Sequence, residues 1–288
     1  MMPFAAILRH DLYLLMGTWL VRLWLAGTVV LTLVLVMGNW PQMRTAPLIA
    51  LLLVPYLVFP WFLVVMVLGI SPVSGARSEA LSDGILSRPV TRYEYLFATW
   101  LARVLLVLGA YLIVIVPTIW LVARWDRPVE ADPVTLFGVC AALGVVGLVL
   151  TLQVTLAFLL GTLLRNPLLA IVMLLVIWYP VDTILHAFQV EEFSPITLSQ
   201  ALPTLLRRPW RGAEEQTPDG TTQEDLQELQ RQFDRLMLGG RAPAKPQPGF
   251  FDQGDYKDFS LVRVILGYGI PTLLALGLTT LSFCWRDL

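Results

Sequence analysis

The run TLFGVCAALGVVGLVLTLQVTLAFLLGTLL, residues 135–164, contains no Asp, Glu, Lys or Arg. A helix needs about 20 apolar residues to cross the ~30 Å hydrocarbon core of a bilayer. This run is longer than a perpendicular crossing needs, so we expect its helix to tilt or to continue past one membrane face. Five other runs are also long and apolar enough, and the six predicted spans cover residues 19–37, 48–70, 104–122, 135–164, 168–186 and 261–283.

The overall composition supports the same interpretation. Apolar and aromatic residues make up 57% of the 288 residues and charged residues only 14%, whereas soluble proteins average about 45–50% and about 25%. A protein core alone cannot absorb this excess, so the second solvent has to be lipid. The net charge of −1 provides no clustered basic face for nucleic acid. The sequence therefore predicts an all-α polytopic membrane protein with six transmembrane helices and no nucleic-acid partner.

Positive charge in the short loops predicts the orientation of the spans. With the N-terminus inside, the cytoplasmic side holds eight arginines and the short external loops hold three. Cytoplasmic loops carry the excess of Lys and Arg in membrane proteins, so both termini and residues 71–95 are predicted to be cytoplasmic. This orientation fits a multi-pass protein of the plasma membrane, which in a bacterium is the inner membrane.

Prolines inside the spans predict changes in helix direction. A proline removes one backbone donor, and in lipid a neighbouring group has to satisfy the freed carbonyl. The second span carries Pro55 and Pro60, so we expect a bend there.

Residues 1–18 predict an amphipathic helix that lies on the inner membrane surface. Its apolar face consists of Phe4, Leu8, Leu12 and Leu15. Arg9, His10 and Asp11 are expected to turn away from that face; a ragged start to the first span is the alternative. The rest of the chain divides into five spans with a cytoplasmic loop at 19–189, an external insert at 190–258, and a sixth span with a cytoplasmic C-terminus at 259–288.

The external insert is polar and contains two predicted helices. The later one ends at the Gly239-Gly240 pair, and its apolar face consists of Leu226, Leu229, Phe233 and Leu236. The earlier one is expected at the outer interface, with apolar residues Ile196, Leu198, Leu202, Leu205 and Leu206. Arg207, Arg208 and Arg211 follow it and are expected to face lipid headgroups. A polar loop with one frayed helix is the alternative for the insert.

Between the second and third spans lies SPVSGARSEALSDGILSRPVTRYEY, residues 71–95. Leu81, Ile85 and Leu86 form the apolar stripe of a short predicted helix, and Pro89 ends it because the residue before a proline disfavours the α region. Thr91 and Glu94 then match a capping box that opens a helix running into the third span. A push on the short helix would thus reach a membrane span. A solvated loop with ordinary caps is the alternative.

The same segment resembles the signature of type-2 ABC exporter permeases. In that family an acidic residue precedes a Leu-rich short helix, a Ser-Arg-Pro-Val-Ser-Arg motif and a Glu-containing start of the third span. The matching residues here are Glu79, Asp83, Ile85, Leu86, Ser87, Arg88, Pro89, Val90, Thr91, Arg92, Glu94, Ala102 and Arg103. The C-terminal FCWRDL, residues 283–288, is similar to the family's aromatic-basic-Asp-Leu ending. The chain departs from the family at Ala80-Leu81, usually Gly-Thr, and at Ala98-Thr99, usually Gly-Lys.

This resemblance implies a membrane subunit that pairs with a second copy or a related permease around an export path. The short helix would dock on a cytoplasmic ABC ATPase, present in two copies, which binds the ATP and Mg and re-orients the spans as it closes. The residues implied in this ATPase coupling are Glu79, Leu81, Asp83, Ile85, Leu86, Arg88, Pro89, Arg92 and Glu94.

Motifs for chemistry within this chain are missing. Neither lysine follows a glycine, so no G-x-x-x-x-G-K-[ST] phosphate loop exists and the ATPase has to be a separate chain. The two histidines, His10 and His186, are too far apart for a His-Glu-x-x-His zinc site. We therefore expect a transport subunit rather than an enzyme, with no cofactor of its own.

Two polar residues inside the spans, Gln153 and Asp182, are candidates for a translocation path because polar groups are costly in lipid. Gln153 equally fits a hydrogen bond between helices, and Asp182 equally fits outer-interface water. A second class of function stays open, a subunit that transmits ATPase motion to an extracytoplasmic protein without moving solute. A wide polar cavity between spans two, four and five would favour transport, and tight packing there would favour transmission.

Overall fold

The computed structural model describes residues 3–75, 91–125, 129, 132–164, 166–187, 194–208 and 260–285, and within them regular secondary structure is helical throughout. The helices are α1 (Pro3–Gly17), α2 (Trp19–Asn39), α3 (Thr45–Leu57), α4 (Trp61–Gly75), α6 (Arg92–Arg124), α7 (Leu136–Leu163), α8 (Pro167–Ala187), α9 (Pro195–Arg207) and α11 (Leu261–Trp285). The predicted all-α class is confirmed for this part of the chain.

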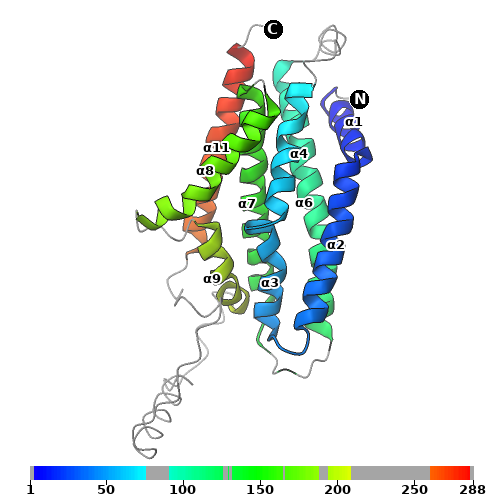
Figure 1. The fold of residues 1–288 in the computed structure, drawn as a ribbon, viewed down its shortest axis with the longest axis vertical. Helices are drawn as coiled ribbons and strands as arrows, with labels where there is room; N and C mark the ends of the chain where they lie inside the picture. Colours follow the sequence, from blue (N-terminus) through cyan, green and yellow to red (C-terminus); the bar gives the residue numbers. More distant parts are fainter. Residues whose placement is uncertain are drawn as a thin grey trace, which may run out of the picture.

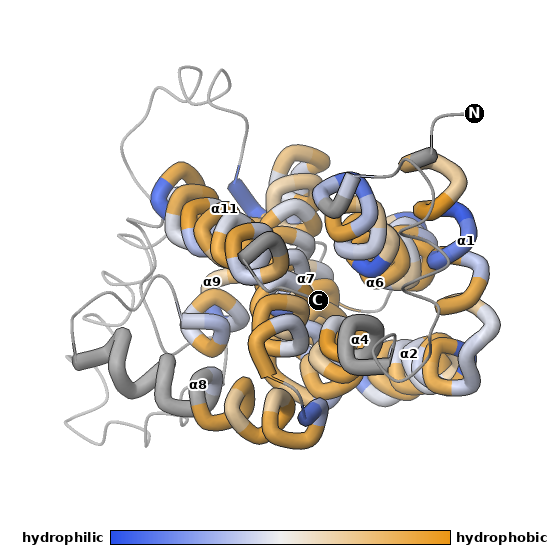
Figure 2. The backbone as a smooth tube through the Cα atoms, turned by 90° about the horizontal axis from the view of Figure 1, so that it is seen from above, coloured by the Kyte–Doolittle hydropathy of each residue, from blue (hydrophilic) through white to orange (hydrophobic). Residues whose placement is uncertain are grey.

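Five helical segments in the described residues are long and apolar enough to cross a membrane: Trp19–Asn39, Thr45–Ile70, Tyr93–Arg124, Leu136–Leu163 and Leu261–Phe283. Large apolar side chains on α2, α6 and α11, such as Leu33, Leu112 and Leu273, point outward and are 54%, 41% and 70% exposed. Figure 2 shows hydrophobic residues along much of the backbone of these helices. The chain is a multi-pass helical membrane protein.

The predicted fifth span, residues 168–186, falls within α8. The apolar part of α8 described without interruption is Pro167–Val176, because the side chains of Ile177 and of residues 179–187 lie outside the described set. In Figure 1, α8 runs obliquely to the long helices rather than alongside them. The described residues thus give five candidate spans, where the sequence predicts six.

The long helices alternate in direction, so the bundle has two distinct ends (Figure 1). One end, which we call the N/C end, carries both chain termini, the end of α4 and the start of α6. The opposite end, which we call the α9 end, carries the α2–α3 turn, the end of α6, the start of α7 and α9. Both termini and the flanks of residues 76–90 therefore share one end, as the predicted alternation of spans requires.

The second span is broken into two helices. α3 ends at Leu57 and α4 begins at Trp61, so the break comes just before and at Pro60. Pro55 lies inside α3 without ending it. The predicted bend is confirmed, and Pro60 is the proline that coincides with it.

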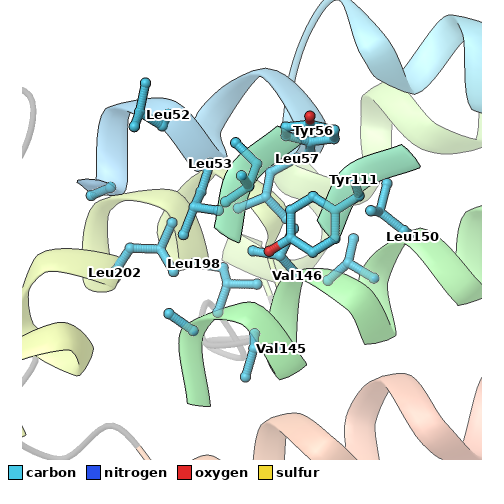
Figure 3. Packing of buried hydrophobic residues seen from close by; sticks show 14 of the residues in the cluster. Leu52, Leu53, Tyr56, Leu57, Tyr111, Val145, Val146, Leu150, Leu198 and Leu202 are labelled. Atoms are coloured by element: carbon cyan, nitrogen blue, oxygen red, sulfur yellow. The ribbon is translucent and has the colours of Figure 1, made fainter. Parts of the chain in front are cut away.

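α7 is the central helix, packed against α4, α6, α8, α9 and α11. Figure 3 shows part of the core around it, with buried side chains from α3, α6, α7 and α9 converging. In that core the rings of Tyr56 and Tyr111 meet edge to face, with centroids 4.9 Å apart. Lipid tails are as apolar as these side chains, so close van der Waals packing holds the helices together.

The backbones of α4 and α7 approach each other closely. A Cβ atom added to Gly161 would lie 2.9 Å from the carbonyl oxygen of Ile70, and one added to Gly69 would lie 3.1 Å from that of Val154. Small residues at such contacts are typical of helix pairs in membranes. Spans two and four are therefore in direct backbone contact over this stretch.

α9 confirms the predicted helix at the start of the insert but lies deeper than expected. Leu198, Leu202, Leu205 and Leu206 are at most 2% exposed, because α9 packs against α3 and α7. Thr135 donates its backbone N–H to the carbonyl of Leu206, at 3.1 Å. For residues 195–207 the alternative of a frayed polar loop is wrong; the predicted helix around 226–236 lies outside the described residues.

The arginine that ends α9 makes an ion pair. Nη2 of Arg207, which the sequence predicts toward lipid headgroups, lies 2.7 Å from Oδ2 of Asp132 in the segment that leads into α7, and the Arg207 side chain is 42% exposed. The ion pair exists because α9 packs beside the start of α7, a proximity that sequence spacing does not reveal.

Candidate functional site

The structure describes both flanks of the segment that carries the family resemblance. Its predicted coupling residues Glu79, Leu81, Asp83, Ile85, Leu86, Arg88 and Pro89 lie outside the described residues. Arg92 and Glu94 lie in the first turn of α6. The structure therefore reports on the helices that enter and leave residues 76–90, and the ATPase-coupling role of the predicted set stays a prediction.

The start of α6 is a capping box, as predicted. The hydroxyl of Thr91 accepts a hydrogen bond from the backbone N–H of Glu94 at 3.3 Å, and Oε2 of Glu94 accepts one from the backbone N–H of Thr91 at 3.2 Å. Two N–H groups that a helix start leaves without partners are thus satisfied. From this cap α6 runs unbroken for 33 residues, so the flank of residues 76–90 is continuous with a full-length helix.

Arg103 joins three helices near the N/C end. It lies in α6 and is only 3% exposed. Its Nε donates to the carbonyl oxygen of Leu68 in α4 at 2.9 Å, and its Nη1 donates to the carbonyl oxygen of Thr99 at 3.1 Å. The guanidinium carbon lies 5.8 Å from the ring centroid of Phe158 in α7, within the range of a cation–π contact. One side chain therefore links α4, α6 and α7.

The nearby negative charge comes from α1. Asp11 is partly buried and interacts electrostatically with Arg103, as does the Tyr95 hydroxyl. The expectation that Asp11 turns away with Arg9 and His10 is wrong, since those two are exposed while Asp11 shares the packed face. A buried guanidinium makes an inward carboxylate favourable, and apolar periodicity alone does not show this.

Aromatic side chains make a second connection between the same helices. The rings of Phe4 in α1 and Phe97 in α6 have centroids 6.2 Å apart, and those of Phe97 and Trp100 are 5.2 Å apart. Nε1 of Trp100 donates to the hydroxyl of Thr155 in α7 at 3.1 Å. α1 is thus tied through α6 to the central helix.

We call this cluster the junction, and it consists of Phe4, Asp11, Leu68, Tyr95, Phe97, Thr99, Trp100, Arg103, Thr155 and Phe158. It unites α1, α4, α6 and α7 at the end of the bundle that flanks residues 76–90. Within the described ranges no group of three or more His, Cys, Asp or Glu could hold a metal ion. The junction is suited to mechanical coupling between helices.

Gln153 lies in α7 and is 1% exposed, and neither its amide nitrogen nor its oxygen has a hydrogen-bond partner among the described residues. The expected hydrogen bond between helices is therefore not made within that part of the chain. Asp182 lies in α8, and its side chain is outside the described set. The translocation-path role of these two residues stays a prediction.

The sequence named Arg103 only as one position of a motif and placed it just before the third span. The structure extends that helix so that Arg103 lies inside the candidate span Tyr93–Arg124, where a charged residue is costly and is a candidate functional position. An arginine next to a long apolar run was the available signal. No comparable sequence feature marked Asp11, the negatively charged residue near Arg103.

No protein-family model matches this chain. No curated protein matches it either.

Proposed function

We propose that this chain is the membrane-spanning permease subunit of a type-2 ABC exporter. It would work as a dimer, with α8 as a sixth span, and couple to a separate cytoplasmic ATPase that binds ATP and Mg. The substrate moved out of the cytoplasm is not specified by these residues. We base this on the resemblance of residues 79–103 and on one structural observation, the junction beside residues 76–90.

The junction supports coupling for a mechanical reason. Residues 76–90 connect α4 to α6, and these two helices are joined by the hydrogen bond from Arg103 to the Leu68 carbonyl at 2.9 Å. α6 opens on a capping box and runs the length of the bundle. A displacement of residues 76–90 would thus move α4 and α6 together. α1 would move with them because it packs against α6.

A second candidate is favoured by the packing between spans two and four. Gly69 and Gly161 allow backbone contact between α4 and α7, and Gln153 is enclosed rather than exposed to a channel. A solute path would then have to run between two copies of the chain. The alternative subunit would transmit motion to an extracytoplasmic protein, and α9, buried against α3 and α7, would carry it into the insert.

The first experiment tests the ATPase coupling. The chain is co-purified with a candidate ABC ATPase from the same source and reconstituted in proteoliposomes, and hydrolysis of Mg-ATP is measured. We expect Glu79→Ala with Asp83→Ala to abolish the effect of the membrane subunit on hydrolysis while leaving it inserted. Glu191→Ala with Glu192→Ala, on the predicted outer side, is the matched control. Unchanged binding and hydrolysis in the first double variant would remove this segment as the coupling element.

The orientation is tested in intact cells by labelling single cysteines with an impermeant maleimide. We expect Pro218→Cys to react and Ser82→Cys to stay unreacted until the membrane is broken. Labelling of Ser82→Cys in unbroken cells would reverse the proposed topology.

The two functional candidates are separated by following the insert. A fluorophore on Pro218→Cys is recorded in proteoliposomes that contain the ATPase and no other solute. An ATP-dependent change in the fluorescence of this label, in the absence of any solute to export, would favour transmission. ATP-dependent export of a compound from the source cell's extract would favour the exporter.

A further inference from the structure

Pro72 lies within the last turn of α4. A proline has no backbone N–H, so it cannot make the helical hydrogen bond to the carbonyl four residues earlier. That carbonyl belongs to Leu68. In a membrane protein a carbonyl freed in this way needs a donor from elsewhere in the protein, since lipid supplies none.

The donor present at Leu68 is Arg103. Its Nε lies 2.9 Å from the Leu68 oxygen, and a hydrogen bond from a charged donor is roughly twice as strong as a neutral one. The same guanidinium bonds the Thr99 carbonyl of its own helix at 3.1 Å, which holds the side chain in place. The Leu68 carbonyl, which has no helical donor in α4, thus accepts a hydrogen bond from a side chain of α6.

Burial protects the hydrogen bond between Arg103 and Leu68 from competition by water. Arg103 is 3% exposed, so water does not compete for the Leu68 oxygen as it would at an open surface. The cost of enclosing the charge is reduced by the Phe158 ring and by the nearby Asp11 of α1. The two contacts come from α7 and α1, so residues of four helices surround this bond.

We propose that Arg103 is a positioning residue that replaces the hydrogen bond Pro72 removes, and so fastens the end of α4 to α6. The two helices that flank residues 76–90 then move as one body. Because Pro72 has no N–H, the Leu68 carbonyl lacks its helical donor, and Arg103 supplies a donor in its place. This holds whether or not the chain is a permease, since any partner acting on residues 76–90 would meet the same fastened pair.

The experiment is a double-mutant cycle between positions 72 and 103 on the full chain in lipid nanodiscs. Pro72→Ala restores the backbone N–H and gives Leu68 a helical donor, so it should make Arg103 dispensable. The measurement is hydrogen–deuterium exchange of amides 69–75, with amides 195–207 of α9 as the internal reference. Arg103→Met removes the donor while keeping an unbranched side chain.

We expect Arg103→Met to speed exchange of residues 69–75 about tenfold in the natural background, the effect of losing one charge-assisted hydrogen bond. With Pro72→Ala the acceleration should fall below about twofold. A purely packing role would give the same acceleration in both backgrounds, and that result would overturn the proposal. No acceleration in either background would overturn it as well.

Pro117→Ala, which restores an N–H elsewhere in α6, is the matched control and should not rescue Arg103→Met. If Arg103→Met does not accumulate in the membrane, the amount of protein in the membrane becomes the measurement. Recovery of accumulation by Pro72→Ala, but not by Pro117→Ala, supports the fastening, and absence of recovery by either overturns it.

Discussion

The two ends of the bundle are held together by different chemistry. At the N/C end the junction relies on a buried charge, with Arg103 bonded to a backbone carbonyl of α4. At the α9 end, four leucines of α9 with at most 2% exposure fill the space beside α3 and α7. At the N/C end a directional hydrogen bond from a buried charge sets the relative position of α4 and α6, whereas at the α9 end buried leucines are accompanied by the backbone hydrogen bond from Thr135 to Leu206.

This difference matches what the two ends connect to. The junction flanks the segment that resembles an ATPase-coupling loop, where a defined relation between α4 and α6 is useful. α9 lies at the start of the predicted insert and is packed against α3 and α7. The following substitutions test the contrast, from the largest expected effect to the smallest.

A charge placed in the apolar end should have the largest effect. Leu202→Asp puts an unpaired carboxylate at a position with 0% exposure, which costs about 3–5 kcal/mol. We expect loss of the monodisperse peak in size-exclusion chromatography after mild heating. Thr204→Asp, exposed on the same helix, should leave the peak intact. Equal behaviour of the two variants would mean that α9 is not docked.

The backbone contact between α4 and α7 should rank second. Gly161→Val adds atoms where a Cβ alone would already lie 2.9 Å from the Ile70 oxygen, and overpacking of this kind costs about 1–3 kcal/mol. The control is Gly144→Val on the same helix, where nothing lies within 4 Å of an added Cβ. Thermal unfolding in detergent should show a lower midpoint for the first variant only.

The charge of α1 should come third. Asp11→Asn removes the negative partner of Arg103 and should cost about 1 kcal/mol, because screening is weaker at a partly buried position. The effect should disappear in an Arg103→Met background, where no charge remains to compensate. His10→Asn, exposed on the same helix, serves as the control in the same unfolding measurement. An undiminished effect without Arg103 would separate Asp11 from the junction.

The exposed ion pair at the α9 end should matter least. Arg207 bonds Asp132 at 2.7 Å, but its side chain is 42% exposed, so Arg207→Gln should cost about 0.5 kcal/mol. The difference from the unsubstituted protein should shrink further in 1 M salt, where the screening length is about 3 Å. A larger loss than for Asp11→Asn would contradict the contrast drawn between the two ends.

Much of the local structure followed from local patterns. The capping box at Thr91 and Glu94 depends on residues three apart, and the break at Pro60 depends on one residue and its neighbours. The apolar stripe of α9 was visible from its spacing alone. Each of these features is decided within one or two helical turns, so a reading of the chain finds them. The extent of the third span was missed because Arg103 marks a boundary only if it faces water.

The sequence by itself determined that this is a helical membrane protein, where most of its long helices lie, and which segment between two of them carries the family resemblance. The tertiary structure decided the rest of the candidate site. Only helix rotation and crossing bring Arg103 to the Leu68 carbonyl, turn Asp11 inward and seat α9 against α3 and α7. These pairs are far apart in sequence, and hydropathy carries no information about which faces of two apolar helices meet.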